Sequence, residues 1–134
     1  MMLFRLLLVA LFVTAGSAHS SASPEWIEYS PEAFSQAQQS GDAILVDVHA
    51  TWCPTCRIQA PILDELRNES AMSGVTFIKV DFDRETEFLE ANRIPRQSTI
   101  LIWQGEREIA RSIAETDRDR LREFVFKAIA EVSE

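Results

Sequence analysis

Two cysteines, Cys53 and Cys56, are separated by two residues, and the chain contains no other cysteine. A cysteine thiolate attacks a disulfide, and a second thiol close by then displaces the mixed disulfide that forms. A disulfide that closes so short a loop removes little conformational entropy from the unfolded chain and so adds little stability. The spacing therefore indicates a pair that opens and closes in thiol–disulfide exchange rather than a structural crosslink.

The segments on either side of this pair predict how it is positioned. A nearly continuous apolar run at 43–50 predicts a strand buried on both faces. Helical spacing of apolar residues predicts a helix at 54–68, directly after Cys53. The sulfur of Cys53 then lies at the positive end of a helix dipole, which stabilises its thiolate. We expect Cys53 to be the more exposed sulfur and the nucleophile, and Cys56 to face the protein body and resolve the mixed disulfide.

The helix at 54–68 is expected to bury one apolar stripe. Its members are predicted to be Ile58, Ile62, Leu63 and Leu66. Pro61 lies inside the same run and is expected to kink the helix, because proline lacks the backbone donor.

The rest of the chain alternates predicted strands and helices. Strands are expected at 26–29, 43–50, 75–80, 99–103 and 107–112, and helices at 31–39, 54–68, 83–91 and after Thr116. This order predicts one domain of α/β class. Its central mixed sheet is parallel in its first part, is closed by an antiparallel hairpin that turns at Gln104 and Gly105, and is flanked by helices.

The ends of two helices carry recognisable signals. Ser30 is expected to cap the first helix, with Pro31 at its first position and Gly41 ending it. Thr116, with Asp119 three residues later, is expected to cap the last helix.

The N-terminal segment differs in composition from the rest of the chain. An apolar run of about ten residues follows a short, positively charged start, and small residues come next. We expect 1–18 to be an export signal cleaved after Ala18, or as late as Ala22, followed by a flexible junction at 19–25 and the domain at 26–134. An uncleaved N-terminal membrane anchor is the alternative. Both interpretations place the domain in the periplasm or another exported location.

The composition argues against several classes of partner. The chain has 134 residues and a net charge of −8, which disfavours nucleic acid as the main partner because phosphate binding needs a basic surface. After cleavage, no stable membrane insertion is expected. Two cysteines and two histidines do not complete a zinc site in one chain without carboxylates. We therefore expect no metal and no cofactor in the chain itself.

The segments 46–56 and 60–66 together resemble the thioredoxin family, and the resemblance extends from about Trp26 to the C-terminus. It implies a thioredoxin-like three-layer sandwich and a redox-active disulfide between the two cysteines. It also implies that Asp47 is the buried aspartate that accepts the proton of Cys56, and that Lys79 tunes the charge of Asp47. An acid inside so apolar a strand is costly without a purpose, which agrees with that role.

The same resemblance implies a group of residues that border the cysteines and contact substrate. They are Thr51, Trp52, Pro54, Thr55, Ser98 and Thr99. His49 alternates with Asp47 along the predicted strand and is expected on the same face, either influencing the proton balance or simply packing in the core.

Two positions depart from the family pattern. Thioredoxins carry Gly-Pro between the cysteines, whereas this chain carries Pro54 and Thr55, which leaves the direction of electron flow open. The family also places a cis-proline opposite the cysteines, where this chain aligns Ser98, with a trans peptide as the expectation. In an alternative register, Pro95 takes the cis-proline position.

These observations favour a reductase that passes electrons to disulfides of exported proteins and is recharged by a membrane redox partner. An oxidase that donates its disulfide is the alternative. A third hypothesis, of another class, is a metal or iron–sulfur cluster held between two chains by Cys53 and Cys56 of each, which the loss of proline at Ser98 would permit.

Overall fold

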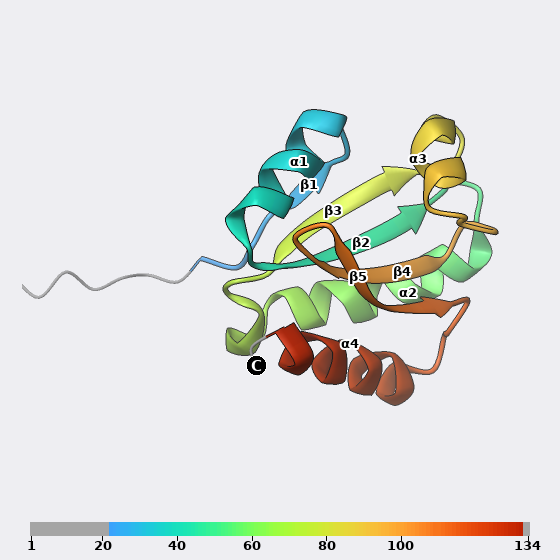
Figure 1. Cartoon of the computed structure of the whole chain (residues 1–134). Coiled ribbons are helices and arrows are strands. Elements are labelled where there is room, and N and C mark those ends of the chain that lie inside the picture. Colours follow the sequence, from blue (N-terminus) through green and yellow to red (C-terminus); the bar gives the residue numbers. More distant parts are fainter. Residues whose placement is uncertain (1–21, 133–134) are drawn as a thin grey trace, which may run out of the picture.

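The computed structural model describes residues 22–132 (Figure 1). The predicted export signal at 1–18 and the first part of the junction lie outside the described residues. Among the described residues, no helix is both long enough and apolar enough to cross a membrane.

A five-stranded mixed sheet forms the centre of the domain, with the strand order β1-β3-β2-β4-β5. The strands are β1 (Trp26–Glu28), β2 (Ala43–His49), β3 (Thr76–Asp81), β4 (Thr99–Gln104) and β5 (Arg107–Ile113). β1, β3 and β2 run parallel, and β4 and β5 are antiparallel to their neighbours. This is the predicted sheet, parallel in its first part and closed by a hairpin.

Helices cover both faces of the sheet, which confirms the three-layer sandwich (Figure 1). They are α1 (Pro31–Ser40), α2 (Pro54–Arg67), α3 (Thr86–Ala91) and α4 (Arg118–Val132), with a short 3₁₀ helix at Ser70–Met72. α1 and α3 lie on one face, and α2 and α4 lie on the other.

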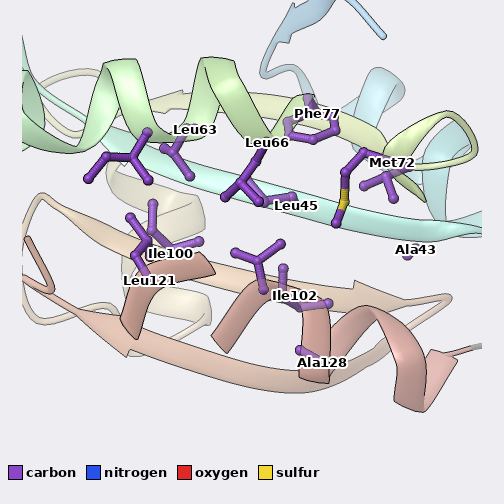
Figure 2. Close-up of a cluster of buried hydrophobic side chains, with 13 residues drawn as sticks. Ala43, Leu45, Leu63, Leu66, Met72, Phe77, Ile100, Ile102, Leu121 and Ala128 are labelled. Atoms are coloured by element: carbon purple, nitrogen blue, oxygen red, sulfur yellow. The ribbon is translucent and has the colours of Figure 1, made fainter. Parts of the chain in front are cut away.

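The strand β2 lies between β3 and β4, so neither of its edges is free. Ile44, Val46 and Val48 pack on the α1/α3 face, whereas Leu45 packs on the α2/α4 face (Figure 2). Burial on both faces explains the continuous apolar run. Asp47 shares the α2/α4 face with Leu45, because successive side chains of a strand alternate.

The first helix begins and ends as its sequence predicts. The hydroxyl of Ser30 accepts the backbone N–H of Ala33 at 3.1 Å, and Pro31 is the first helical residue. Gly41 ends the helix in the left-handed conformation, with φ of 78°, which glycine adopts without the steric cost other residues meet.

The buried face of α2 differs from the prediction at one position. Ile58 is 52% exposed, and Gln59 takes its place in the buried stripe with Ile62, Leu63 and Leu66. Residues 59, 62, 63 and 66 follow helical spacing more closely than a stripe that begins at 58. The helix continues through Pro61 to Arg67.

The last helix is capped one residue later than predicted. The side chain of Asp117 accepts the backbone N–H of Arg120 at 2.9 Å, and its carbonyl accepts the N–H of Leu121. The prediction that Thr116 caps this helix was therefore wrong. An aspartate in the next position can cap the helix from there, and aspartate caps helices at least as well as threonine does.

Candidate active site

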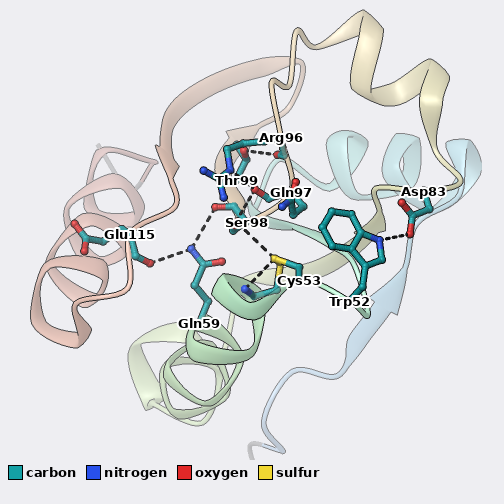
Figure 3. Close-up of a disulfide and its surroundings, with 10 residues drawn as sticks. Trp52, Cys53, Gln59, Asp83, Arg96, Gln97, Ser98, Thr99 and Glu115 are labelled. Carbon is teal, nitrogen blue, oxygen red and sulfur yellow. Dashed lines mark hydrogen bonds between the residues drawn. A yellow bond between two sulfur atoms is a disulfide. The ribbon is translucent and has the colours of Figure 1, made fainter.

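Cys53 and Cys56 form a disulfide in the first turn of α2, with their Cα atoms 5.3 Å apart (Figure 3). Cys53 is the N-cap of this helix, and its sulfur accepts the backbone N–H of Cys56 at 3.1 Å. Pro54 at the first helical position has no backbone donor of its own. The geometry therefore places the first sulfur at the amide end of the helix, as the sequence predicts.

Both sulfurs are buried in this disulfide form. Cys53 is 0% exposed and packs with Cys56, Ala50 and Phe82. The expectation that Cys53 is the more exposed sulfur was therefore wrong. One physical reason is that the segment preceding β4 places the buried Ser98 against the sulfur of Cys53.

Ser98 lies opposite the disulfide, immediately before β4 (Figure 3). Its hydroxyl oxygen is 3.8 Å from the Cys53 sulfur, and no cis peptide bond occurs within residues 22–132. The structure thus confirms Ser98, with a trans peptide, as the residue that faces the cysteines. The alternative register, with Pro95 in a cis peptide, was wrong.

Gln59 contacts this segment and was not among the predicted site residues. Its side-chain amide donates to the carbonyl of Ser98 at 3.2 Å and to the carbonyl of Glu115 at 3.0 Å (Figure 3). The signal that could have found it is its position: it lies on the buried stripe of α2, one turn after Cys56, where an apolar residue is expected.

Trp52 is a large apolar side chain that is 52% exposed. Its indole N–H donates to the carboxylate of Asp83 at 2.8 Å, which fixes the ring beside the disulfide (Figure 3). Thr51 and Pro54 are exposed as well, and Thr55 is half-buried. These four residues form the accessible rim of the site.

Thr99 and Ser98 differ from the rim residues because both are buried. The hydroxyl of Thr99 donates to the carbonyl of Arg96 at 2.8 Å, which leaves the side chain no free surface for a substrate. The structure therefore supports a role for Ser98 towards the sulfur and gives Thr99 a structural one.

Asp47 and Lys79 lie in register on the neighbouring strands β2 and β3. Asp47 is buried on the face that α2 covers, and burial raises its pKa to about 6, although the positive charge of Lys79 acts to lower it. One carboxylate oxygen of Asp47 has no hydrogen-bond partner among the described residues. Such a carboxylate can take up a proton near neutral pH. Its transfer from Cys56 stays a prediction.

His49 follows Asp47 on the same face of β2 and is half-buried. Its pKa is lowered by burial and by the charge of Lys79, so the imidazole is neutral near pH 7. Within the described residues 22–132, no group of three or more His, Cys, Asp or Glu side chains could hold a metal ion.

The family model for thioredoxin matches residues 25–127. The chain belongs to the thioredoxin family. A thioredoxin from Chlamydia trachomatis is 31% identical over 98 residues, which cover 73% of this chain and 93% of that relative. A thioredoxin from Alicyclobacillus acidocaldarius is 32% identical over 88 residues, which cover 66% of this chain and 83% of the relative.

A solved structure, that of Trxlp from Edwardsiella tarda, agrees with this membership. It is 39% identical, with a TM-score of 0.72, and the match covers 75% of this chain and 97% of that one. Members of the thioredoxin family are thiol–disulfide oxidoreductases, and the paired Cys53 and Cys56 supply that chemistry here. The chain is therefore a thioredoxin-fold enzyme of thiol–disulfide exchange.

Proposed function

We propose that this thioredoxin-family enzyme is a reductase for disulfides of exported proteins, acting in the periplasm or another exported compartment. The observation that carries the direction is the burial of Cys53 and Cys56 against Ala50 and Phe82. An apolar environment disfavours thiolates and so destabilises the reduced form. A dithiol that is unstable relative to its disulfide gives its electrons away.

The reaction takes two exchange steps. The Cys53 thiolate attacks a substrate disulfide, one substrate sulfur leaves as a thiolate, and a mixed disulfide joins Cys53 to the other sulfur. Asp47 accepts the proton of Cys56, directly or through water. The Cys56 thiolate then attacks the Cys53 sulfur, which releases the second substrate thiol and restores the disulfide. Two electrons pass to the substrate, and two protons complete its thiols.

The substrate is a protein segment with apolar side chains. Trp52 and Ile58 are each 52% exposed, and Pro54 at the start of α2 is exposed between them in the sequence. Large apolar groups exposed beside a reactive disulfide favour the docking of an unfolded or flexible chain. Trp52 is held in place by Asp83, so this surface is pre-formed.

Export rests on the N-terminal sequence, which resembles a signal of the cleaved type. An exported compartment is oxidising, so a reductase there needs a membrane redox partner that returns electrons to Cys53 and Cys56. The purified, exported protein should begin near Ala18 or Ala22, as intact mass would show. Recovery of the uncleaved chain in the cytoplasm would contradict this part of the proposal.

The reductase activity is tested with the reduced protein and insulin as a disulfide substrate. The wild-type protein should release substrate thiols and recover its own disulfide. Cys53→Ser should do neither, and Cys56→Ser should accumulate as a mixed disulfide with insulin. Release of free substrate by Cys56→Ser at the wild-type rate would rule out the resolving role.

An oxidase that donates its disulfide is the second candidate. The observation in its favour is the capping of α2 by Cys53, whose sulfur accepts the Cys56 amide at 3.1 Å, because such contacts stabilise a thiolate. If this candidate is right, the protein oxidises a reduced peptide dithiol faster than it reduces insulin. The two-chain cluster, for which the serine at position 98 is the support, predicts stoichiometric iron or other metal in the purified protein.

A further inference from the structure

The buried stripe of α2 contains one polar side chain, Gln59, which is 1% exposed. Burying an amide costs free energy unless its polar atoms are satisfied, and the oxygen of Gln59 has no partner among the described residues. Its nitrogen, by contrast, spans two carbonyls, those of Ser98 and Glu115. Gln59 thus occupies a core position from which its amide links two other segments to α2.

Both backbone polar groups of Ser98, the N–H and the carbonyl, are hydrogen-bonded. Its amide donates to Val48 at 2.7 Å, and its carbonyl accepts both the N–H of Ala114 at 2.9 Å and the amide of Gln59. Its φ is 62°, in the left-handed region, which is unfavourable for a serine. These bonds compensate that strain and fix the direction of the side chain.

The hydroxyl of Ser98 has one proton and two possible acceptors. In the disulfide form its oxygen lies 2.6 Å from the carbonyl of Gln97, to which it donates, and 3.8 Å from the sulfur of Cys53 (Figure 3). A disulfide sulfur is a weak acceptor, so the carbonyl takes the proton. A thiolate is an anion and a much stronger acceptor, and rotation about the C–O bond is enough to turn the proton towards it.

We propose that Ser98 is a catalytic residue whose hydroxyl donates to the Cys53 thiolate after reduction, and that Gln59 is the positioning residue that holds Ser98 against this sulfur. Gln59 and Cys56 are one helical turn apart on α2. The same rigid element therefore fixes the sulfurs and the segment that faces them. With the Cys56 amide, the hydroxyl gives the thiolate two donors.

This inference rests on thiol–disulfide exchange and not on the proposed direction of electron flow. Several titratable or charged groups lie on the elements around the sulfur, and all of them stay in place in the variants below. They are Asp47 and His49 on β2, Lys79 on β3, Cys56 and Arg57 on α2, Asp83 beside Trp52, and Arg96 in the segment before β4.

The first variant is Ser98→Ala, which removes the hydroxyl and keeps a side chain with the same backbone preference. Titration of the reduced protein by thiolate absorbance should show the acid dissociation constant of Cys53 falling about tenfold. At a pH where Cys53 is ionised in both proteins, the equilibrium of Ser98→Ala with glutathione should lie about tenfold further towards the protein disulfide. This corresponds to a reduction potential lower by about 30 mV. Below the pH at which Cys53 ionises, the two proteins should agree, because neither then holds a thiolate.

The second variant, Gln59→Leu, should shift Cys53 in the same direction by a smaller factor, since the hydroxyl remains but is no longer fixed. In the Ser98→Ala background, adding Gln59→Leu should not change the acid dissociation constant of Cys53 any further, because Gln59 acts through the hydroxyl. The matched control is Gln104→Leu: Gln104 also donates to two carbonyls, those of Gly41 and Val132, but at the opposite end of β4.

An unchanged dissociation constant in Ser98→Ala would overturn the role of the hydroxyl. An equal effect of Gln59→Leu with and without the hydroxyl would overturn the positioning role. A Gln59→Leu protein that only loses stability, while Cys53 ionises as in the wild type, would overturn it as well. The control Gln104→Leu should leave the ionisation of Cys53 unchanged, because Gln104 lies at the opposite end of β4. These measurements use only the protein's own thiols and glutathione, so they can fail while the proposed reductase activity holds, and the reverse.

Discussion

Asp47 and Lys79 are register partners on β2 and β3, yet the ammonium group of Lys79 lies over the indole ring of Trp26, 4.8 Å from its centroid. The indole N–H in turn donates to Asp64 at 2.9 Å. Lys79 thus acts on the buried carboxylate through its charge, while one oxygen of Asp47 has no partner among residues 22–132. A base arranged in this way is available to take a proton.

The buried carboxylate should make stability depend on pH. The pKa of Asp47 is raised from 3.8 to about 6, so the folded state binds the proton more tightly than the unfolded state. This stability is fully present below pH 3.8 and is lost as the pH rises to about 6. Relative to the wild type, Asp47→Asn should therefore gain on the order of 2 to 3 kcal/mol between pH 3 and pH 8.

Urea unfolding of both proteins across this range measures the difference directly. Asp42→Asn is the matched control, because Asp42 is exposed just before the same strand. A stability difference between wild type and Asp47→Asn that is independent of pH would show that Asp47 titrates as an exposed carboxylate does.

The charge of Lys79 should set the pH at which the resolving step begins. If ionised Asp47 accepts the proton of Cys56, the rate of this step rises with pH around 6 in the wild type. Lys79→Met removes a charge that lowers the pKa of Asp47, so the rise should move to higher pH. Rapid-quench measurement of mixed-disulfide decay gives this profile, with Lys127→Met on the outer surface of α4 as the control. A wild-type profile in Lys79→Met would contradict the tuning role.

The exposed Ile58 should contribute to substrate docking rather than to chemistry. Ile58→Ser removes exposed apolar surface on α2, two residues after Cys56, so KM for a protein disulfide should rise by about threefold to tenfold while kcat stays near the wild-type value. Ile27→Ser is the control, because Ile27 is 42% exposed on the edge strand β1, beside α1. Equal effects of the two substitutions would assign no docking role to Ile58.

Local signals in the sequence predicted most of the fold. The buried run of β2 and the ends of α1 follow from alternation, capping and proline and glycine preferences, which act within a few residues. The disulfide and its place at the start of α2 follow from the spacing of Cys53 and Cys56 and the helical pattern after them. These are interactions that a short segment specifies on its own.

The details of the site depend on contacts between distant segments. Gln59 and Ser98 are 39 residues apart in the chain, so no local pattern pairs them. The burial of Cys53 has the same origin, because a segment 45 residues later faces its sulfur. Helical periodicity could have predicted that Gln59, and not Ile58, lies in the buried stripe. A prediction based on hydrophobicity alone selects the isoleucine instead.

The reduction potential of the Cys53–Cys56 pair tests the proposed reductase most directly. Equilibration of the purified protein with glutathione buffers at pH 7, followed by alkylation and mass measurement, gives the fraction in each state. Burial of the sulfurs predicts a reduction potential near about −270 mV, the value typical of a reducing thioredoxin. A potential near about −120 mV would contradict the reductase and make the protein a donor of disulfides.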